Sequence, residues 1–408
     1  MKTLLTISWR NIWRHPARSS VLLAAIIIGL WAGVMAVGTM NGMIQQRTDH
    51  VIDSELTHVQ VHHPEFLSEG YSWMYIPDHE KITSWLDDDE RVASHTSRVL
   101  TDGMLQSPVK TTGIRIRGID MESENRTTTF HENMVEGDYL DTDMRNPVII
   151  GRRLADEHNL DLGHRIVLTF EDVNNELTSG SFNIAGFFES ASADYDKRNV
   201  LIRSGDFLAL LSDQPVYHEI AMMLENDACA SSVASDLNNE FPDIHAQTWS
   251  QLSPELNMMV QMGGSMTYII TMIIMIALAF GILNTMLMAL FERMRELGML
   301  ISIGMSRLRV FTMIMLESVM LSITGAVAGM LLARASLYYF RDTGINLEIF
   351  ADARGFAEIG FDHIIYPIIT PGEYTGILLV VIFITLLASL YPALKAIRIN
   401  PLEAAKDH

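Results

Sequence analysis

Four long stretches of the chain carry few or no charged side chains. A helix rises 1.5 Å per residue and needs about 20 apolar residues to cross a hydrocarbon core of about 30 Å. All four stretches are long enough, and Glu317 is the only charged residue within 19–46, 256–291, 310–333 and 374–394. The pattern therefore predicts four transmembrane segments, at residues 19–46, 258–291, 310–340 and 374–396.

The second apolar stretch is longer than a membrane requires. As one helix, residues 256–291 would extend about 54 Å, so residues 258–291 are predicted to comprise an outer stalk followed by the second span. Gly263 and Gly264 lie where the stalk would meet the bilayer. They would either permit bending there or let another helix approach closely.

Residues 47–257 alternate short strand and helix patterns. Val59 and Val61 alternate with polar neighbours before Pro64, which is typical of a strand. Further strand patterns are GIRIRGID, NPVIIG, HRIVLTF, SFNIAGFF, RNVLIR and HEIAMML, and helical ones are DHEKITSWLDDD, RRLADEHN, SGDFLALLS and ASSVASDLNNEF. The fold class predicted is an α-helical membrane protein with a large mixed α/β domain, in one or two lobes, between its first two spans.

Basic residues predict the orientation, because Lys and Arg near the ends of spans stay in the cytoplasm. They occur in residues 1–18, predicted as an interfacial helix, in the loop 292–309 and in the tail 397–408. Both termini are therefore predicted inside, and residues 47–257 and 341–373 outside. The first outer segment holds 38 acidic and 15 basic residues, so nucleic acid is excluded as its partner.

The chain shows no motif for chemistry of its own. It has no G-x-x-x-x-G-K-[ST] sequence, so any use of ATP must come from a partner chain. His58, His62 and His63 lack a second group of ligands at metal spacing, and one cysteine, Cys229, cannot form an intrachain disulfide. We expect a non-catalytic subunit without a metal or cofactor.

The loop between the second and third spans has an ordered pattern. One short helix ending near Gly304 would present Met299, Leu300 and Ile303 as a docking surface, with Arg293, Arg295 and Glu296 around them. A solvated connector that obeys the positive-inside rule is equally compatible with the pattern.

Three motifs resemble those of FtsX/MacB-type ABC permeases. They are WRNIWRHPARS at 9–19, RELGMLISIG at 295–304 and YPALKAIRINPLEA at 391–404. HVQVHHP at 58–64, RGID at 117–120 and VIIGRRLA at 148–155 are similar to the lipoprotein-releasing LolC/LolE group.

The resemblance implies a MacB-like periplasmic domain, an inner-membrane location and a second permease chain, forming a homodimer or a LolC/LolE-like heterodimer. It also implies a cytoplasmic ABC ATPase dimer that binds ATP and Mg, and a periplasmic lipoprotein carrier or adaptor. The ATPase would press on a coupling helix within 292–309, whose residues are Arg293, Arg295, Glu296, Gly298, Leu300, Ile303 and Gly304.

Extraction of lipoproteins or another amphiphile from the outer leaflet, driven by mechanotransmission, is the leading functional hypothesis. MacB-like efflux of peptides or small molecules is one alternative. FtsX-like signalling to a cell-wall partner is another, in which no substrate is moved.

Several membrane residues have two interpretations each. Met40, Met43, Met258, Met262 and Met266 would form an adaptable surface for acyl chains, or would only pack helices. Glu317 would fix packing through a buried hydrogen bond, or couple protons. The G-x-x-x-G pairs, Gly38 with Gly42 and Gly325 with Gly329, predict close helix packing.

Overall fold

The computed structural model describes residues 16–140, 143–346 and 364–397, which divide into two compact units. The membrane unit comprises residues 16–44, 261–346 and 364–397 of this described part, and the outer unit comprises residues 45–260. Most of the predicted interfacial helix at 1–18 and of the tail at 397–408 lies outside the described residues.

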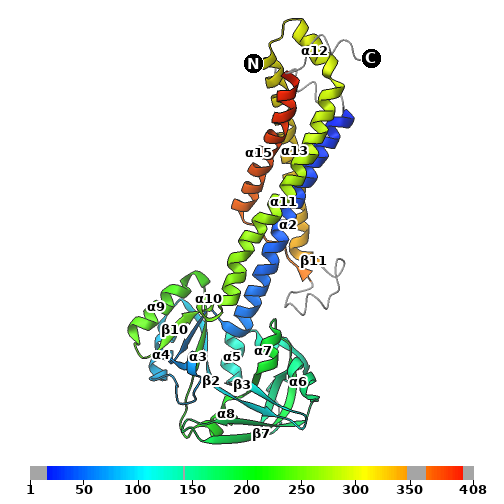
Figure 1. Ribbon diagram of the computed structural model, residues 1–408. Coiled ribbons are helices and arrows are strands. Elements are labelled where there is room, and N and C mark those ends of the chain that lie inside the picture. The colour runs from blue at the N-terminus through cyan, green and yellow to red at the C-terminus, as the bar shows by residue number, and fades with distance from the viewer. Residues whose placement is uncertain (1–15, 141–142, 347–363, 398–408) are drawn as a thin grey trace. The chain divides into compact units, whose positions relative to one another are not determined.

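The membrane unit is built on four long helices that lie side by side (Figure 1). They are α2 (Pro16–Val51), α11 (Pro254–Glu292), α13 (Arg307–Thr343) and α15 (Pro371–Ile397), and each is long and apolar enough to cross a membrane. Ile26, Leu30, Ile282, Leu321 and Val381 meet in their shared core. The four predicted spans are confirmed as helices.

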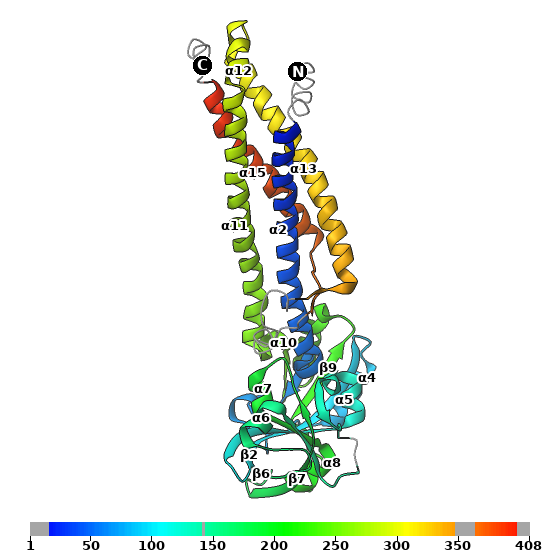
Figure 2. The same ribbon diagram turned by 90° about the vertical axis from the view of Figure 1, so that its right-hand side faces the viewer.

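The predicted outer loop at 341–373 contains two short strands, β11 (Ile345–Asn346) and β12 (Ile364–Ile365), paired antiparallel. Residues 366–370 then lead into α15. Ile368 donates its backbone N–H to the carbonyl oxygen of Gly38 at 2.9 Å, which holds this segment against α2. Short helix α12 (Met294–Ser302) joins α11 to α13 (Figure 2).

The outer unit is organised by one long strand, β2 (Val92–Gln106). Its first half pairs with β9 (Glu219–Leu224), beyond which lie β1 (Val59–His62) and β10 (His245–Thr248). Helices α4 (His79–Asp88) and α9 (Ala230–Glu240) supply Ile82, Leu86, Val233 and Leu237 to the core of this half.

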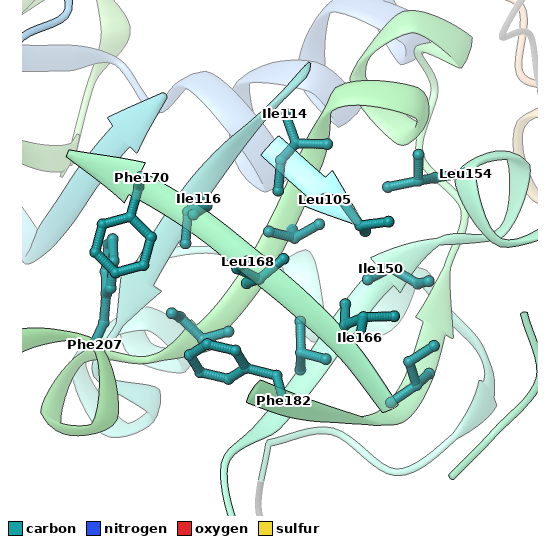
Figure 3. Packing of buried hydrophobic residues seen from close by; sticks show 14 of the residues in the cluster. Leu105, Ile114, Ile116, Ile150, Leu154, Ile166, Leu168, Phe170, Phe182 and Phe207 are labelled. Carbon is teal, nitrogen blue, oxygen red and sulfur yellow. The ribbon is translucent and has the colours of Figure 1, made fainter. Parts of the chain in front are cut away.

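The second half of β2 belongs to a closed ring of six strands. The pairing order is β2, β3 (Thr111–Ile119), β8 (Asn199–Arg203), β5 (Pro147–Gly151), β7 (Leu177–Phe188), β6 (Arg165–Glu171) and β2 again. Alternate side chains point inward, so Ile116, Leu168, Phe170 and Phe182 fill the interior with Phe207 (Figure 3). The outer unit thus has two cores joined through β2.

Shorter elements complete the outer unit. β4 (Met134–Gly137) extends the sheet beside β7. The helices are a π-helical turn (Ile52–Leu56), α3 (Phe66–Glu69), α5 (Met121–Thr127), a 3-10 turn (Phe130–Asn133), α6 (Arg152–His158), α7 (Ala193–Arg198), α8 (Ser204–Leu211), a second 3-10 turn (Asp227–Cys229) and α10 (Trp249–Leu252).

Candidate coupling surface and membrane sites

Helix α12 is a short amphipathic helix between two long ones. It ends where Gly304 adopts a positive φ of 103°, a conformation that glycine takes without steric cost. The Gly304 and Met305 backbone N–H groups donate to the carbonyl oxygens of Ile301 and Leu300, as in a helix terminus stabilised by a left-handed residue. The helix bounds agree with the predicted end near Gly304.

The inner face of α12 is fixed to the long helices. Leu297 is buried in a cluster with Leu290 of α11, Val310 and Met313 of α13, and Ala396 of α15. The neighbouring Gly298 is also buried. Displacing α12 would therefore disturb the ends of three long helices at once.

An ion pair adds to this attachment. Arg293, immediately before α12, donates from Nη1 to both carboxylate oxygens of Glu317 in α13, at 3.1 Å each. The side chains are only 13% and 15% exposed, so the pair is largely shielded from water. Arg293 Nε also lies 3.5 Å from Glu296.

The outer face of α12 points away from the Leu297 cluster. Met299 is 60% exposed and Ile303 is 84% exposed, with Arg295 exposed beside them. Leu300, expected on the same surface, is half-buried against the Leu297 cluster instead. Arg293 and Gly298 also face inward, so only part of the predicted set lies on the coupling surface, which we define as Arg295, Glu296, Met299, Ile303 and Gly304.

The predicted methionine surface is partly exposed. Met258, Met262 and Met266 are 58%, 57% and 48% exposed on α11, at i, i+4 and i+8 along one helix face. Met40 and Met43 of α2 are half-buried. Methionine side chains on an exposed helix face can change conformation more easily than side chains packed in a core.

A buried charge network in the outer unit was not predicted from the sequence. Arg98 of β2 donates to Glu124 of α5 and to Glu219 of β9, and all three side chains are at most 3% exposed. His62 of β1 lies 3.2 Å from Glu219, and Arg117 of β3 lies 3.5 Å from it. The network therefore links four strands and a helix across both halves of the unit.

The network keeps its central carboxylate ionised. Burial by itself would raise the pKa of Glu219, but the guanidinium groups of Arg117 and Arg98 outweigh this and hold the pKa well below its usual range. Loss of one member would leave an uncompensated buried charge, so the network disfavours other arrangements of these strands. No local pattern indicated the network, because strand β2 itself was not predicted and the carboxylates come from other elements.

Two family models match this chain. A model of the FtsX-like permease C-terminal matches residues 268–401, and a model of the MacB-like periplasmic core domain matches residues 19–240, more than half of the chain. This chain belongs to the FtsX/MacB-type permease family. It is an ABC transporter permease, and family members of this kind work with an ATPase partner.

Individual relatives support this assignment. The chain is 18% identical over 403 residues to the lipoprotein-releasing system transmembrane protein LolC of Neisseria meningitidis, covering 95% of this chain and 93% of that protein. It is 20% identical to LolE of Haemophilus influenzae across the whole of both chains. It is 30% identical over 146 residues to the macrolide export ATP-binding/permease protein MacB of Sodalis glossinidius, which covers 34% of this chain and 20% of that protein.

The two G-x-x-x-G pairs of this FtsX/MacB-type permease lie against different segments. A Cβ at Gly325 or Gly329 would meet Ile26 or Ile27 of α2, so this pair does allow two helices to approach. Gly42 instead faces the extended segment before α15, where its Cβ would lie 2.1 Å from the carbonyl oxygen of Tyr366. A Cβ on Gly38 would meet both Pro367 of this segment and Leu337 of α13. The expectation of close helix packing is therefore corrected for Gly42.

Gly263 and Gly264 also differ. Helix α11 is continuous through both. A Cβ on Gly263 would meet Ile44 of α2 at 2.2 Å, whereas one on Gly264 would meet nothing within 4 Å. Close approach, rather than bending, is therefore the role of Gly263.

The three histidines after α2 form hydrogen bonds within the outer unit. His62 contacts Glu219, His58 accepts from the backbone N–H of Leu224 at 3.0 Å, and His63 accepts from that of Glu65 at 3.3 Å. Within residues 16–140, 143–346 and 364–397, no group of three metal-ligating side chains is present. Cys229 is half-buried against the core that includes α4 and α9.

Proposed function

We propose that this permease extracts lipoproteins, or another amphiphile with acyl chains, from the outer leaflet of the inner membrane. The observation that carries the proposal is the similarity to LolC and LolE over nearly the entire chain. Both relatives are named for lipoprotein release. The match to MacB covers only about a third of this chain.

ATP would be bound and hydrolysed by a separate ATPase dimer that docks on the coupling surface. The exposed Met299 and Ile303 provide an apolar contact, and Arg295 and Glu296 provide charged ones. Since Leu297 and the Arg293–Glu317 pair fix α12 to the long helices, a push on α12 would move those helices. The termini and this loop would lie in the cytoplasm.

Helix α11 would carry the movement outward. It is one unbroken helix of 39 residues, which extends about 58 Å. The exposed Met258, Met262 and Met266 lie near its far end and would hold acyl chains of differing length, because methionine side chains adapt to irregular apolar shapes. A second permease chain, identical or a sibling, would complete the surface, and a periplasmic carrier would receive the cargo.

Photocrosslinking in host membranes tests the proposal. A benzoylphenylalanine at Met262 is expected to capture a protein labelled with radioactive palmitate, and ATP should reduce the yield at least threefold by releasing it. Leu331 of α13, which is 65% exposed, gives the control position. Equal capture at both positions would reject the methionine surface as a binding site. No acylated product at Met262, together with ATPase activity stimulated by peptides, would reject lipoprotein extraction in favour of efflux. Stimulation by a cell-wall hydrolase alone would instead favour signalling.

A further inference from the structure

A cavity of about 510 Å³ opens in the membrane unit between α13, α15 and the segment that leads into α15. Arg334, Tyr338 and Arg341 of α13 line one side, and Pro367, Ile368 and Tyr374 line the other. It thus combines two guanidinium groups with aliphatic and aromatic walls. This amphiphilic lining lies at the opposite end of α13 from the coupling surface.

The position along α13 places the cavity at a membrane boundary. Residues 310–333 carry no charged side chain except Glu317, and as a helix they rise about 36 Å, enough to cross a hydrocarbon core of about 30 Å. Arg334 is therefore level with the headgroups on the side away from α12. Arg341 lies seven residues, or about two turns, further and on the same face.

The two guanidinium groups have unmatched charge. Across residues 16–140, 143–346 and 364–397, no carboxylate forms an ion pair with either one, and both side chains are exposed. Glu373, the carboxylate of the adjacent turn of α15, accepts instead from Asn41 Nδ2, from the Thr370 N–H and from Thr370 Oγ1, at 2.9 Å each. The cavity therefore presents net positive charge.

The apolar wall beside these charges is rigid. Tyr374 donates its hydroxyl to the carbonyl oxygen of Met330 at 2.7 Å, which fixes its ring against α13. Ile368 is held by its hydrogen bond to Gly38. A free inorganic anion would gain nothing from such a wall, whereas a lipid has an acylglycerol part to lay against it.

We propose that this cavity binds the headgroup of an anionic glycerophospholipid of the outer leaflet. Arg334 and Arg341 contact the phosphodiester and the headgroup, since one guanidinium group can donate two parallel hydrogen bonds to two phosphate oxygens. Leu337, Ile368 and Tyr374 contact the glycerol and the first acyl carbons. The lipid is a resident component of the permease, distinct from any cargo on α11, and its binding does not depend on the cargo proposed above.

Native mass spectrometry tests this site. The full-length chain is purified with its co-purifying subunits and exchanged into phosphatidylglycerol or phosphatidylcholine with the same acyl chains. We expect one phosphatidylglycerol per chain to be retained at least tenfold more than phosphatidylcholine. The variant R334Q/R341Q should lose that preference. The variant R307Q/R309Q, which removes two exposed arginines from the other end of the same helix, should retain it within twofold.

Three results would overturn the proposal. Equal losses in the two double variants would indicate a general effect of charge, and equal retention of both lipids in the parent protein would indicate no headgroup site. Displacement of the lipid by 10 mM inorganic phosphate would identify a simple anion site. A thermal scan of each variant with and without phosphatidylglycerol separates misfolding from lost binding, because a folded but non-binding R334Q/R341Q protein keeps its lipid-free Tm and loses only the lipid-dependent increase.

Discussion

Arg293, the residue that precedes α12, donates two hydrogen bonds of 3.1 Å to Glu317, which lies about three turns into α13. This ion pair and the apolar cluster around Leu297 together attach α12 to the long helices. A helix held in this way would move together with the long helices.

The first prediction concerns this pair. E317Q should weaken the attachment of α12 by about 1.5–3 kcal/mol, since a hydrogen bond to a charged group is lost while Arg293 remains shielded. Hydrogen exchange of residues 293–303 in the full-length protein would show the increase in opening. The reversed pair R293E/E317R should recover part of the protection. Unchanged protection in E317Q, together with loss of a pH dependence of transport, would support proton coupling instead.

The second prediction concerns docking of the ATPase. I303D should leave the fold intact, because this side chain is 84% exposed, but should lower ATPase co-purification at least tenfold. L308D, at a side chain that is 73% exposed outside α12, serves as the control. Gly304 is a less useful probe, since any side chain there would strain the positive φ. Equal binding by I303D and the parent would remove α12 from the interface.

The third prediction separates two glycines one turn apart. G42A should destabilise the membrane unit by about 1–3 kcal/mol, because the new methyl would lie 2.1 Å from a backbone oxygen that cannot rotate away. G38A should be nearly neutral, since its nearest neighbour would be at 3.4 Å. Thermal unfolding in detergent compares the two. Equal shifts would mean that the Tyr366 segment is free to move.

The fourth prediction concerns acid stability of the outer unit. The folded-state pKa of Glu219 is depressed, so the stability it contributes is complete above the unfolded-state pKa and is lost as the pH falls through the lower folded-state value. E219Q should cost about 3–5 kcal/mol at neutral pH, because Arg98 is left buried without one partner. It should also flatten the decline in stability below about pH 4.

Both the loss of stability at neutral pH and its pH dependence can be measured by unfolding the full-length protein in urea at pH 7, 5 and 3. Hydrogen exchange of β2 and β9 monitors the outer unit. A parent protein whose outer unit loses stability no more steeply than E219Q below pH 4 would contradict the assigned ionisation of Glu219.

The sequence by itself determined the spans and many of the outer elements. Long uncharged stretches have one stable solution in a bilayer, so α2, α11, α13 and α15 followed from composition and length. Strands such as β5 and β8 are continuous apolar runs, and helices such as α4 and α9 have one apolar face, so local pattern sufficed for them as well.

Strand β2 was missed although it joins both halves of the outer unit. His95, Ser97 and Arg98 interrupt its apolar alternation, and a buried arginine is compatible with a strand only when carboxylates from elsewhere surround it. Glu124 and Glu219 come from α5 and β9, far along the chain. No local pattern contains that information.

The tertiary structure also decided what each predicted membrane residue faces. The sequence placed Gly42 and Gly325 in equivalent motifs and grouped Leu300 with Ile303. In the structure Gly42 faces an extended segment and Gly325 faces a helix, and Leu300 is turned inward while Ile303 is exposed. Periodicity fixes which residues share a helix face, but what lies opposite that face depends on contacts between segments distant in the chain.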